Sequence, residues 1–405
     1  MKIIVQKFGG TSVASKELRE KVARKIIQSK ESGYYPVVVV SAMGRKGDPY
    51  ATDTLINLAY SAHSQDTGRE LDMIMSCGEI ISSVLLANVI KSMGYEAAAL
   101  TGFQAGIITN NQFGNAEVLK VDSKNILKNL QKGLIPVVTG FQGITMDGDI
   151  TTLGRGGSDT TASLLGEALN ADVVEIYTDV DGVMTADPRL VPHAKVIDHI
   201  CYDEIYQMAE DGAKVVHPKA VDIARRSSIP LVIKNTFTDA PGTIIGNLNR
   251  VAYDEEIIRH KPEKLLTAIS HKHDIVQVTI SIENLHEKNQ LLMNELTKHQ
   301  ISIDLINFFT DKKVFTIHQK DLGELEKILK ENNFQYSVLK DCSKVTIIGH
   351  RIRGVPGVMA RIVNTLSAEN ITILQTSDSH TTISCLVNSK DVEKTVNALH
   401  KEFKL

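Results

Sequence analysis

Apolar strands that alternate with helices constrain the fold of residues 1–246 more than any other feature. Pro36 to Ser41 (PVVVVS) is uninterrupted apolar sequence, typical of a strand covered on both faces of a mainly parallel sheet. Leu134 to Thr139 (LIPVVT) and Val173 to Thr178 (VVEIYT) are further predicted strands. Helical patterns at residues 71–89 and 158–169 fall between such strands. This alternation predicts a doubly wound α/β domain, a mainly parallel sheet between two layers of helices.

The first strand ends in a glycine turn. Lys2 to Phe8 reads as a buried strand, Gly9-Gly10 interrupts it, and a helical pattern starts after Ser15, a suitable N-cap. Such a turn exposes backbone N–H groups that bind phosphate readily, and Lys7 is close enough in sequence to reach the same anion. A plain turn is the alternative, because the spacing fits neither the P-loop nor the dinucleotide fingerprint.

The pattern changes after residue 246. Residues 247–263 are polar and charged and predict a linker or a crossing helix. Two βαββαβ patterns follow, over residues 264–341 and 342–405, as a weak repeat of about 65 residues. The second copy stops before its fourth strand, and residues 265–270 (LLTAIS) are the candidate to replace it. The chain is therefore expected to hold a catalytic domain and two small ferredoxin-like units.

Composition excludes several classes of protein. The net charge of −3 gives no electrostatic case for nucleic acid as a partner. The four cysteines are scattered without a CxxC pair, which indicates a reducing compartment and no structural zinc. No apolar run approaches the roughly 20 residues that cross a bilayer, and no signal-peptide pattern is present. A cytoplasmic protein without a membrane partner is expected.

Two further stretches carry side chains suited to ligand binding. Arg155 is embedded in glycines (LGRGGSDTT, residues 153–161), and its guanidinium suits a bidentate pair with a carboxylate. Ser158 and Asp159 follow at a helix start, where simple capping is the alternative. Glu79 comes after Ser76-Cys77-Gly78 and has apolar neighbours, which argues against a solvated surface charge.

These motifs resemble those of the aspartate kinases of the amino-acid kinase family. The matching stretches are KFGGTSV at residues 7–13, the Glu79 segment and LGRGGSDTT, and the two C-terminal units resemble ACT domains. The resemblance runs in order along the whole chain. It implies an amino-acid kinase fold and transfer of the ATP γ-phosphate to the β-carboxylate of L-aspartate. The product, 4-phospho-L-aspartate, would lead to diaminopimelate, lysine, threonine and methionine.

The resemblance also assigns roles to single residues. Lys7 and Asp159 would be catalytic, and Mg²⁺ would sit on the ATP phosphates without a protein ligand. ATP would be bound by Lys7, Phe8, Gly9, Gly10, Thr178, Asp179, Met184, Arg189 and Lys214. Glu79 would take the α-ammonium of aspartate and Arg155 its α-carboxylate. The full aspartate set is Ser41, Thr52, Glu79, Arg155, Gly156 and Ser158, and residues 44–51 before Thr52 are longer and more charged than the family pattern.

Other interpretations remain at this level. A glutamate 5-kinase-like enzyme and a non-catalytic amino-acid sensor are the alternatives, and the chain length disfavours a fusion to a dehydrogenase. In the first ACT-like unit, Ser302 and Phe308 occupy positions where lysine- or threonine-sensing relatives often have Asn and Gln. Residues 283–290 of that unit lack glycine and proline, whereas residues 354–357 of the second unit (GVPG) form a typical ACT loop.

These departures set the expectation for regulation and assembly. We expect no concerted inhibition by lysine plus threonine, and an effector such as diaminopimelate or lysine alone. Because ACT units usually pair edge to edge, a homodimer or a higher homo-oligomer is expected.

Overall fold

The computed structural model describes most of the chain. The described residues are 1–63, 68–213, 215–247, 266–281, 286–349, 352 and 356–405. Residues 248–263 of the predicted linker lie outside them. So do Lys214, Leu265, residues 282–285, and Gly354 and Val355 of the predicted ACT loop.

The chain divides into two units. The first comprises Met1–Val183, Val196–Ala209 and the described part of Lys214–Ile258, and the second comprises Met184–Lys195, Glu210–Ala213 and the described part of Arg259–Leu405. Two short segments that interrupt the sequence of the first unit therefore belong to the second unit. In that unit Ala186 and Val191 are buried in one hydrophobic cluster with Ile269, Val345 and Val396.

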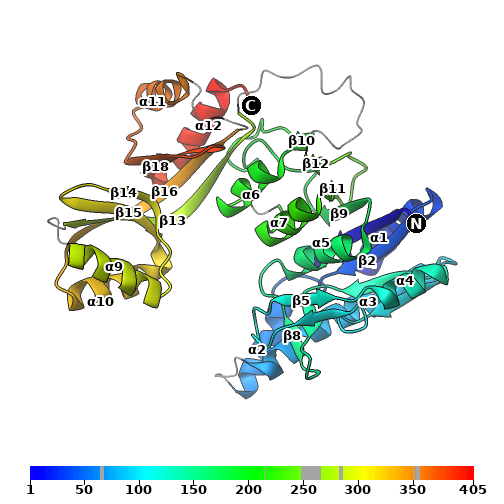
Figure 1. The fold of residues 1–405 in the computed structure, drawn as a ribbon. Helices are drawn as coiled ribbons and strands as arrows, with labels where there is room; N and C mark the ends of the chain where they lie inside the picture. Colours follow the sequence, from blue (N-terminus) through cyan, green and yellow to red (C-terminus); the bar gives the residue numbers. More distant parts are fainter. Residues whose placement is uncertain (64–67, 214, 248–265, 282–285, 350–351, 353–355) are drawn as a thin grey trace. The chain divides into compact units, whose positions relative to one another are not determined.

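A mainly parallel sheet forms the centre of the first unit (Figure 1). Its strands are β1 (Ile3–Phe8), β2 (Tyr35–Val40), β3 (Ala97–Leu100), β6 (Ile135–Thr139), β9 (Val173–Thr178), β10 (His199–Ile200), β11 (Leu231–Asn235) and β12 (Thr243–Ile245). They are ordered β10-β12-β11-β9-β1-β2-β6-β3. The neighbours from β11 to β3 run parallel, whereas β12 is antiparallel to β11. Val37 to Val40 are fully buried, as predicted for a strand covered on both faces.

Helices cover both faces of this sheet. The described helices of residues 1–246 are α1 (Lys16–Glu31), α2 (Thr52–Ala62), α3 (Arg69–Ser92), α4 (Lys124–Gln131), α5 (Gly157–Leu169), α6 (Tyr202–Glu210) and α7 (Pro218–Ser227). Phe8 packs in a cluster with Val22 of α1 and Leu86 of α3. Its neighbour Lys7 reaches Asp159 of α5. Because successive side chains of a strand point to opposite faces, α1 and α3 lie on one face and α5 on the other, which confirms the predicted fold class.

Helix α3 contradicts one expectation from the sequence. By length and composition alone it is apolar enough to cross a membrane, with a mean hydropathy of 1.8 in its most apolar window. Half of that window is buried inside the structure, as in the core helix of a globular protein. Its buried Asp72 accepts hydrogen bonds from the N–H groups of Gly114 and Thr152. A helix anchored in this way belongs to the core of the unit.

A small second sheet in the first unit was not predicted. Its strands are β4 (Ile107–Thr109), β5 (Val118–Val121), β7 (Gln142–Ile144) and β8 (Ile150–Thr152), in the order β5-β4-β7-β8. These strands are only three or four residues long. They therefore leave little periodicity to detect in the sequence.

The two predicted ACT-like units share one six-stranded sheet in the second unit. Its strands are ordered β14-β15-β13-β16-β18-β17. Their bounds are β13 (Ala268–Ser281), β14 (Asp304–Phe308), β15 (Lys312–His318), β16 (Gln335–Ile348), β17 (Gln375–Asp378) and β18 (Thr382–Asn388). The helices are α9 (His286–Lys298), α10 (Leu322–Glu331), α11 (Val358–Ala368) and α12 (Val392–Glu402).

The long strands β13 and β16 each replace two predicted strands. Residues 268–272 of β13 pair with residues 348–344 of β16, which pair in turn with β18. Residues 275–281 of β13 pair with β15 on one side and with residues 342–335 of β16 on the other. The polar residues between the two halves resemble a turn in sequence. Instead each strand continues through a shift in the register of the β13–β16 pairing. Near this shift φ is 58° at Asp274 and 56° at Asp341. At this joint the buried Lys344 forms ion pairs of 2.5 Å with Asp211 and with Asp304.

Candidate active site

The predicted site residues of the first unit gather at the carboxyl ends of adjacent parallel strands. Phe8 at the end of β1 is in register with Val40 of β2 and with Tyr177 of β9. The residues that follow these ends are Gly9, Ser41 and Thr178–Asp179. In open α/β sheets, ligands bind at this edge. The edge is therefore the candidate active site.

The glycine turn after β1 packs tightly against the chain after β2. A Cβ on Gly10 would lie 2.3 Å from the carbonyl oxygen of Ala42, so a side chain has no room there. Close approach, rather than a positive φ, therefore requires glycine at this position. Residues Gly10–Val13 form a 3₁₀ turn, and the buried hydroxyls of Ser12 and Thr236 lie 2.7 Å apart. Thr236 was not predicted, although it follows directly after strand β11.

Lys7 and Asp159 are brought together across this edge. The Lys7 ammonium lies 2.7 Å from a carboxylate oxygen of Asp159, and the two side chains are 13% and 14% exposed. The ammonium also lies 3.8 Å from the position of a Cβ on Gly9, so it stands directly beside the turn. The Phe8 side chain, in contrast, is fully buried and stacks on Tyr177 with ring centroids 4.6 Å apart. Phe8 therefore offers a ligand only its backbone.

The glycines around Arg155 have conformations that other residues avoid. Gly154 and Gly156 have φ of 71° and 67°, in the left-handed region. A Cβ on Gly156 would also lie 2.1 Å from the ring of His217, a residue to which the sequence assigned no role. Arg155 is exposed between the two glycines and forms no ion pair with a described residue. Its guanidinium is therefore available to a ligand.

Two serines link this loop to β2. The Ser41 hydroxyl donates to the Ser158 hydroxyl at 3.0 Å, which holds the start of α5 against the end of β2. Among the described residues, Thr52 makes no side-chain hydrogen bond, and it stands at the first position of α2. No hydrogen bond among the described residues links Thr52 to this serine pair.

Glu79 is a buried carboxylate with one oxygen that has no hydrogen-bond partner among the described residues. Its side chain is 2% exposed, and Oε1 accepts a hydrogen bond of 3.0 Å from the N–H of Ala42. Within the described residues Oε2 has no hydrogen-bond partner. Burial raises the pKa of Glu79 to about 8. A cation placed at Oε2 would compensate this desolvated charge.

The remaining predicted residues have different outcomes. Thr178 and Asp179 follow β9, and the Asp179 carboxylate forms an ion pair of 3.0 Å with Arg45, which was not predicted. Met184 and Arg189 belong to the second unit, where Arg189 pairs with Asp187 at 2.6 Å. The Arg189 side chain in this ion pair is largely exposed. Lys214 lies outside the described residues.

The chain was compared with known proteins. Residues 2–235 match the amino acid kinase family and residues 337–401 match an ACT domain. Aspartokinase 1 of Bacillus subtilis (strain 168) is 42% identical over 406 residues, which covers 100% of both chains. Aspartokinase III of E. coli in complex with aspartate and ADP (R-state) is similar in structure over 100% of both chains, with a TM-score of 0.80 and 27% identity. The same enzyme in complex with lysine and aspartate (T-state) gives a TM-score of 0.75 over the same coverage.

Proposed function

This chain belongs to the aspartokinases of the amino acid kinase family, and from that membership we propose the reaction it catalyses. It transfers the γ-phosphoryl group of ATP to the β-carboxylate of L-aspartate, giving 4-phospho-L-aspartate and ADP. The observation that carries the proposal is the Lys7–Asp159 ion pair beside the glycine turn. The reaction would open a cytoplasmic pathway to diaminopimelate, lysine, threonine and methionine.

The proposed mechanism is an in-line attack of the aspartate β-carboxylate on the γ-phosphorus. The nucleophile is ionised at neutral pH, so no general base is needed, and the protein contributes mainly positioning and charge stabilisation. Lys7 and the N–H groups of Gly9 and Gly10 stabilise the charge that develops on the transferred group. Asp159 holds the Lys7 ammonium in place at 2.7 Å.

The amino acid is recognised at its two α-substituents. Glu79 accepts the α-ammonium at Oε2, the buried oxygen without a described partner. Arg155 pairs with the α-carboxylate, for which its exposed position and free guanidinium are suited. The hydroxyls of Ser41 and Ser158, 3.0 Å apart, complete the proposed aspartate site.

ATP binds along the turn and the residues after β9. Lys7 and the turn amides contact the phosphates, and Thr178–Asp179 lie on the nucleoside side. Mg²⁺ would enter with the ATP phosphates. When bound, Mg²⁺ neutralises phosphate charge.

A coupled assay of ADP release tests the reaction. We expect turnover with ATP and L-aspartate, and at least a hundredfold lower kcat/KM with L-glutamate, because one additional methylene displaces either the reacting carboxylate or the α-substituents. Preferred turnover of glutamate would favour a glutamate 5-kinase-like enzyme. No turnover with any small amino acid would leave the sensor interpretation.

The second unit would act as a feedback sensor and as a dimer interface. One edge strand of its sheet is β14, in which Ile306 and Phe308 are 47% and 55% exposed, and Phe309 directly after it is 48% exposed. An exposed apolar edge of this kind supports pairing with a second copy of the chain. The minimum assembly would then be a homodimer.

An inhibition panel tests the proposed regulation. We expect diaminopimelate or lysine alone to inhibit, and lysine plus threonine to inhibit no more than the two separately, because Ser302 and Phe308 replace the amide side chains of such sites. The measurement is initial velocity at fixed aspartate with lysine, threonine, methionine and diaminopimelate, singly and in pairs. Strong synergy between lysine and threonine would contradict this expectation.

A further inference from the structure

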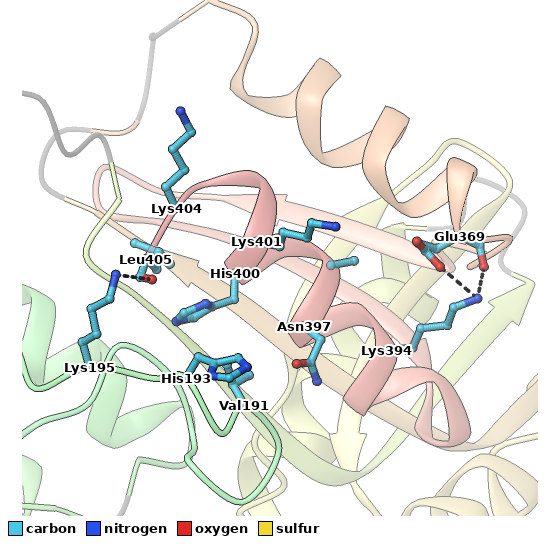
Figure 2. Close-up of a pocket in the computed structure, with 11 residues that line it drawn as sticks. Val191, His193, Lys195, Glu369, Lys394, Asn397, His400, Lys401, Lys404 and Leu405 are labelled. Atoms are coloured by element: carbon cyan, nitrogen blue, oxygen red, sulfur yellow. Dashed lines mark hydrogen bonds and ion pairs between the residues drawn. The ribbon is translucent and has the colours of Figure 1, made fainter.

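The second unit contains a cavity that none of the proposed roles uses. Its volume is about 540 Å³, and it lies between the loop that holds Val191 and helix α12. Figure 2 shows Val191, His193 and Lys195 on the loop and His400 and Lys401 on the helix. This volume is in the range of small-molecule sites, roughly 300–1,000 Å³.

The walls of the cavity are held in place by hydrogen bonds. The Asn397 amide on α12 donates to the carbonyl oxygen of Leu190 at 2.8 Å. The His400 ring is 2.9 Å from the Thr185 hydroxyl, and both groups are buried. The loop and the helix are thus fixed to each other without a ligand. A preformed site of this kind loses little conformational entropy on binding.

The lining is strongly cationic. Four lysines and two histidines line the cavity, against Glu369 as the acidic side chain among the lining residues. Glu369 is already paired with Lys394 at 3.1 Å. Lys195 donates at 3.3 Å to an oxygen of Leu405, the last residue of the 405-residue chain, whose terminal carboxylate is the second negative group of the lining. Lys401 and Lys404 form no ion pair with a described residue. Several ammonium groups around one concave space attract anions and repel cations.

We propose that this cavity binds a small anion that carries a diphosphate group. A diphosphate brings several negative charges in a compact form, which matches ammonium groups contributed by the loop and by α12. A cationic amino acid is disfavoured by the same charges, so the site is separate from the proposed amino acid effector site. The diphosphate can be inorganic pyrophosphate or part of a nucleotide, and the two sources are distinguished by experiment.

Calorimetric titration of the full chain with inorganic pyrophosphate, and separately with ADP, tests the proposal. We expect Lys401→Glu/Lys404→Glu to raise the pyrophosphate Kd at least tenfold. The control Lys327→Glu/Lys330→Glu makes the same charge change on the exposed face of α10. This control and Lys7→Ala should each leave the pyrophosphate Kd of the cavity within twofold of that of the unmodified chain. Lys401→Gln/Lys404→Gln replaces the charge reversal if circular dichroism shows that the latter is unfolded.

Hydrogen exchange then locates the bound anion. We expect pyrophosphate to slow exchange in residues 190–195 and 394–404. Protection by ADP in the same segments would make a nucleotide the natural source, and protection by pyrophosphate alone would make it the inorganic anion. Loss of binding in Lys7→Ala only, an equal loss in the α10 control, or no binding by the unmodified chain would overturn the proposal. The first of these outcomes would still be compatible with the proposed kinase reaction.

Discussion

Lys7→Ala is expected to lower kcat about a thousandfold and to change the KM for aspartate by less than threefold. The ammonium of Lys7 stands 2.7 Å from Asp159 and beside Gly9, at the turn proposed to hold the transferring phosphoryl group. Its charge is needed most when negative charge develops in the transition state, so its loss affects kcat. Steady-state kinetics with both substrates varied measure the effect.

The matched control is Lys2→Ala, which removes a lysine just before the same strand. Lys2 lies over the Tyr34 ring at 4.4 Å, away from the turn, and kcat should change less than twofold. Thermal unfolding of both variants separates lost chemistry from lost folding, because Lys7→Ala leaves Asp159 without its cation. A change confined to the KM for aspartate would show that Lys7 serves the amino acid instead.

Glu79→Gln is expected to lower kcat/KM for aspartate about a hundredfold while the KM for ATP stays within threefold. The substitution keeps the shape of the side chain and an oxygen that can accept the 3.0 Å bond from Ala42. It removes the charge that would pair with the α-ammonium, and a buried pair of this kind is worth roughly 2–5 kcal/mol. An equal loss for ATP would contradict the assignment of Glu79 to aspartate.

The pH dependence gives a second measurement on the same variant. Burial raises the pKa of Glu79 to about 8, so the free enzyme holds this carboxyl protonated at pH 7. Only the ionised form pairs with the ammonium, so kcat/KM for aspartate should rise about tenfold per pH unit below pH 8 and then level off. Glu79→Gln should lack this rise. A profile that is the same in both proteins would assign the titration to another group.

The free energy of unfolding should fall as the pH rises, whereas kcat/KM should rise. Because the pKa of Glu79 is raised on folding, from 4.5 to about 8, the folded state binds more protons than the unfolded chain within that window. Stability from this group is therefore complete below pH 4.5 and is lost as the pH rises through 8. Chemical denaturation of Glu79→Gln across this range should show a smaller loss than the unmodified chain.

Features encoded in short stretches of sequence could be predicted. The strand VVVV, the N-cap Ser15 and the glycine turn each have a local physical cause, and the structure has Ser15 accepting from Leu18 as expected. The meeting of Lys7 with Asp159 follows from two such stretches, because the strand end and the helix start belong to one edge of the sheet.

Features that depend on distant partners could not be predicted. The Arg45–Asp179 ion pair joins residues far apart in sequence and has no pattern of its own. The polar stretch around Asp274 resembles a turn, yet pairing on both sides keeps it within one strand. The free oxygen of Glu79 is visible only once the residues around it are packed.

The two segments Met184–Lys195 and Glu210–Ala213 have a consequence for the modularity of the protein. They place the chain in the second unit twice before its main sequence begins. Ala186 and Val191 are covered by that unit's core, and Asp211 by Lys344. Truncation at one position would remove the packing partners of these side chains, so the two units cannot be exchanged between proteins independently of each other. An exchanged second unit must bring along the segments Met184–Lys195 and Glu210–Ala213.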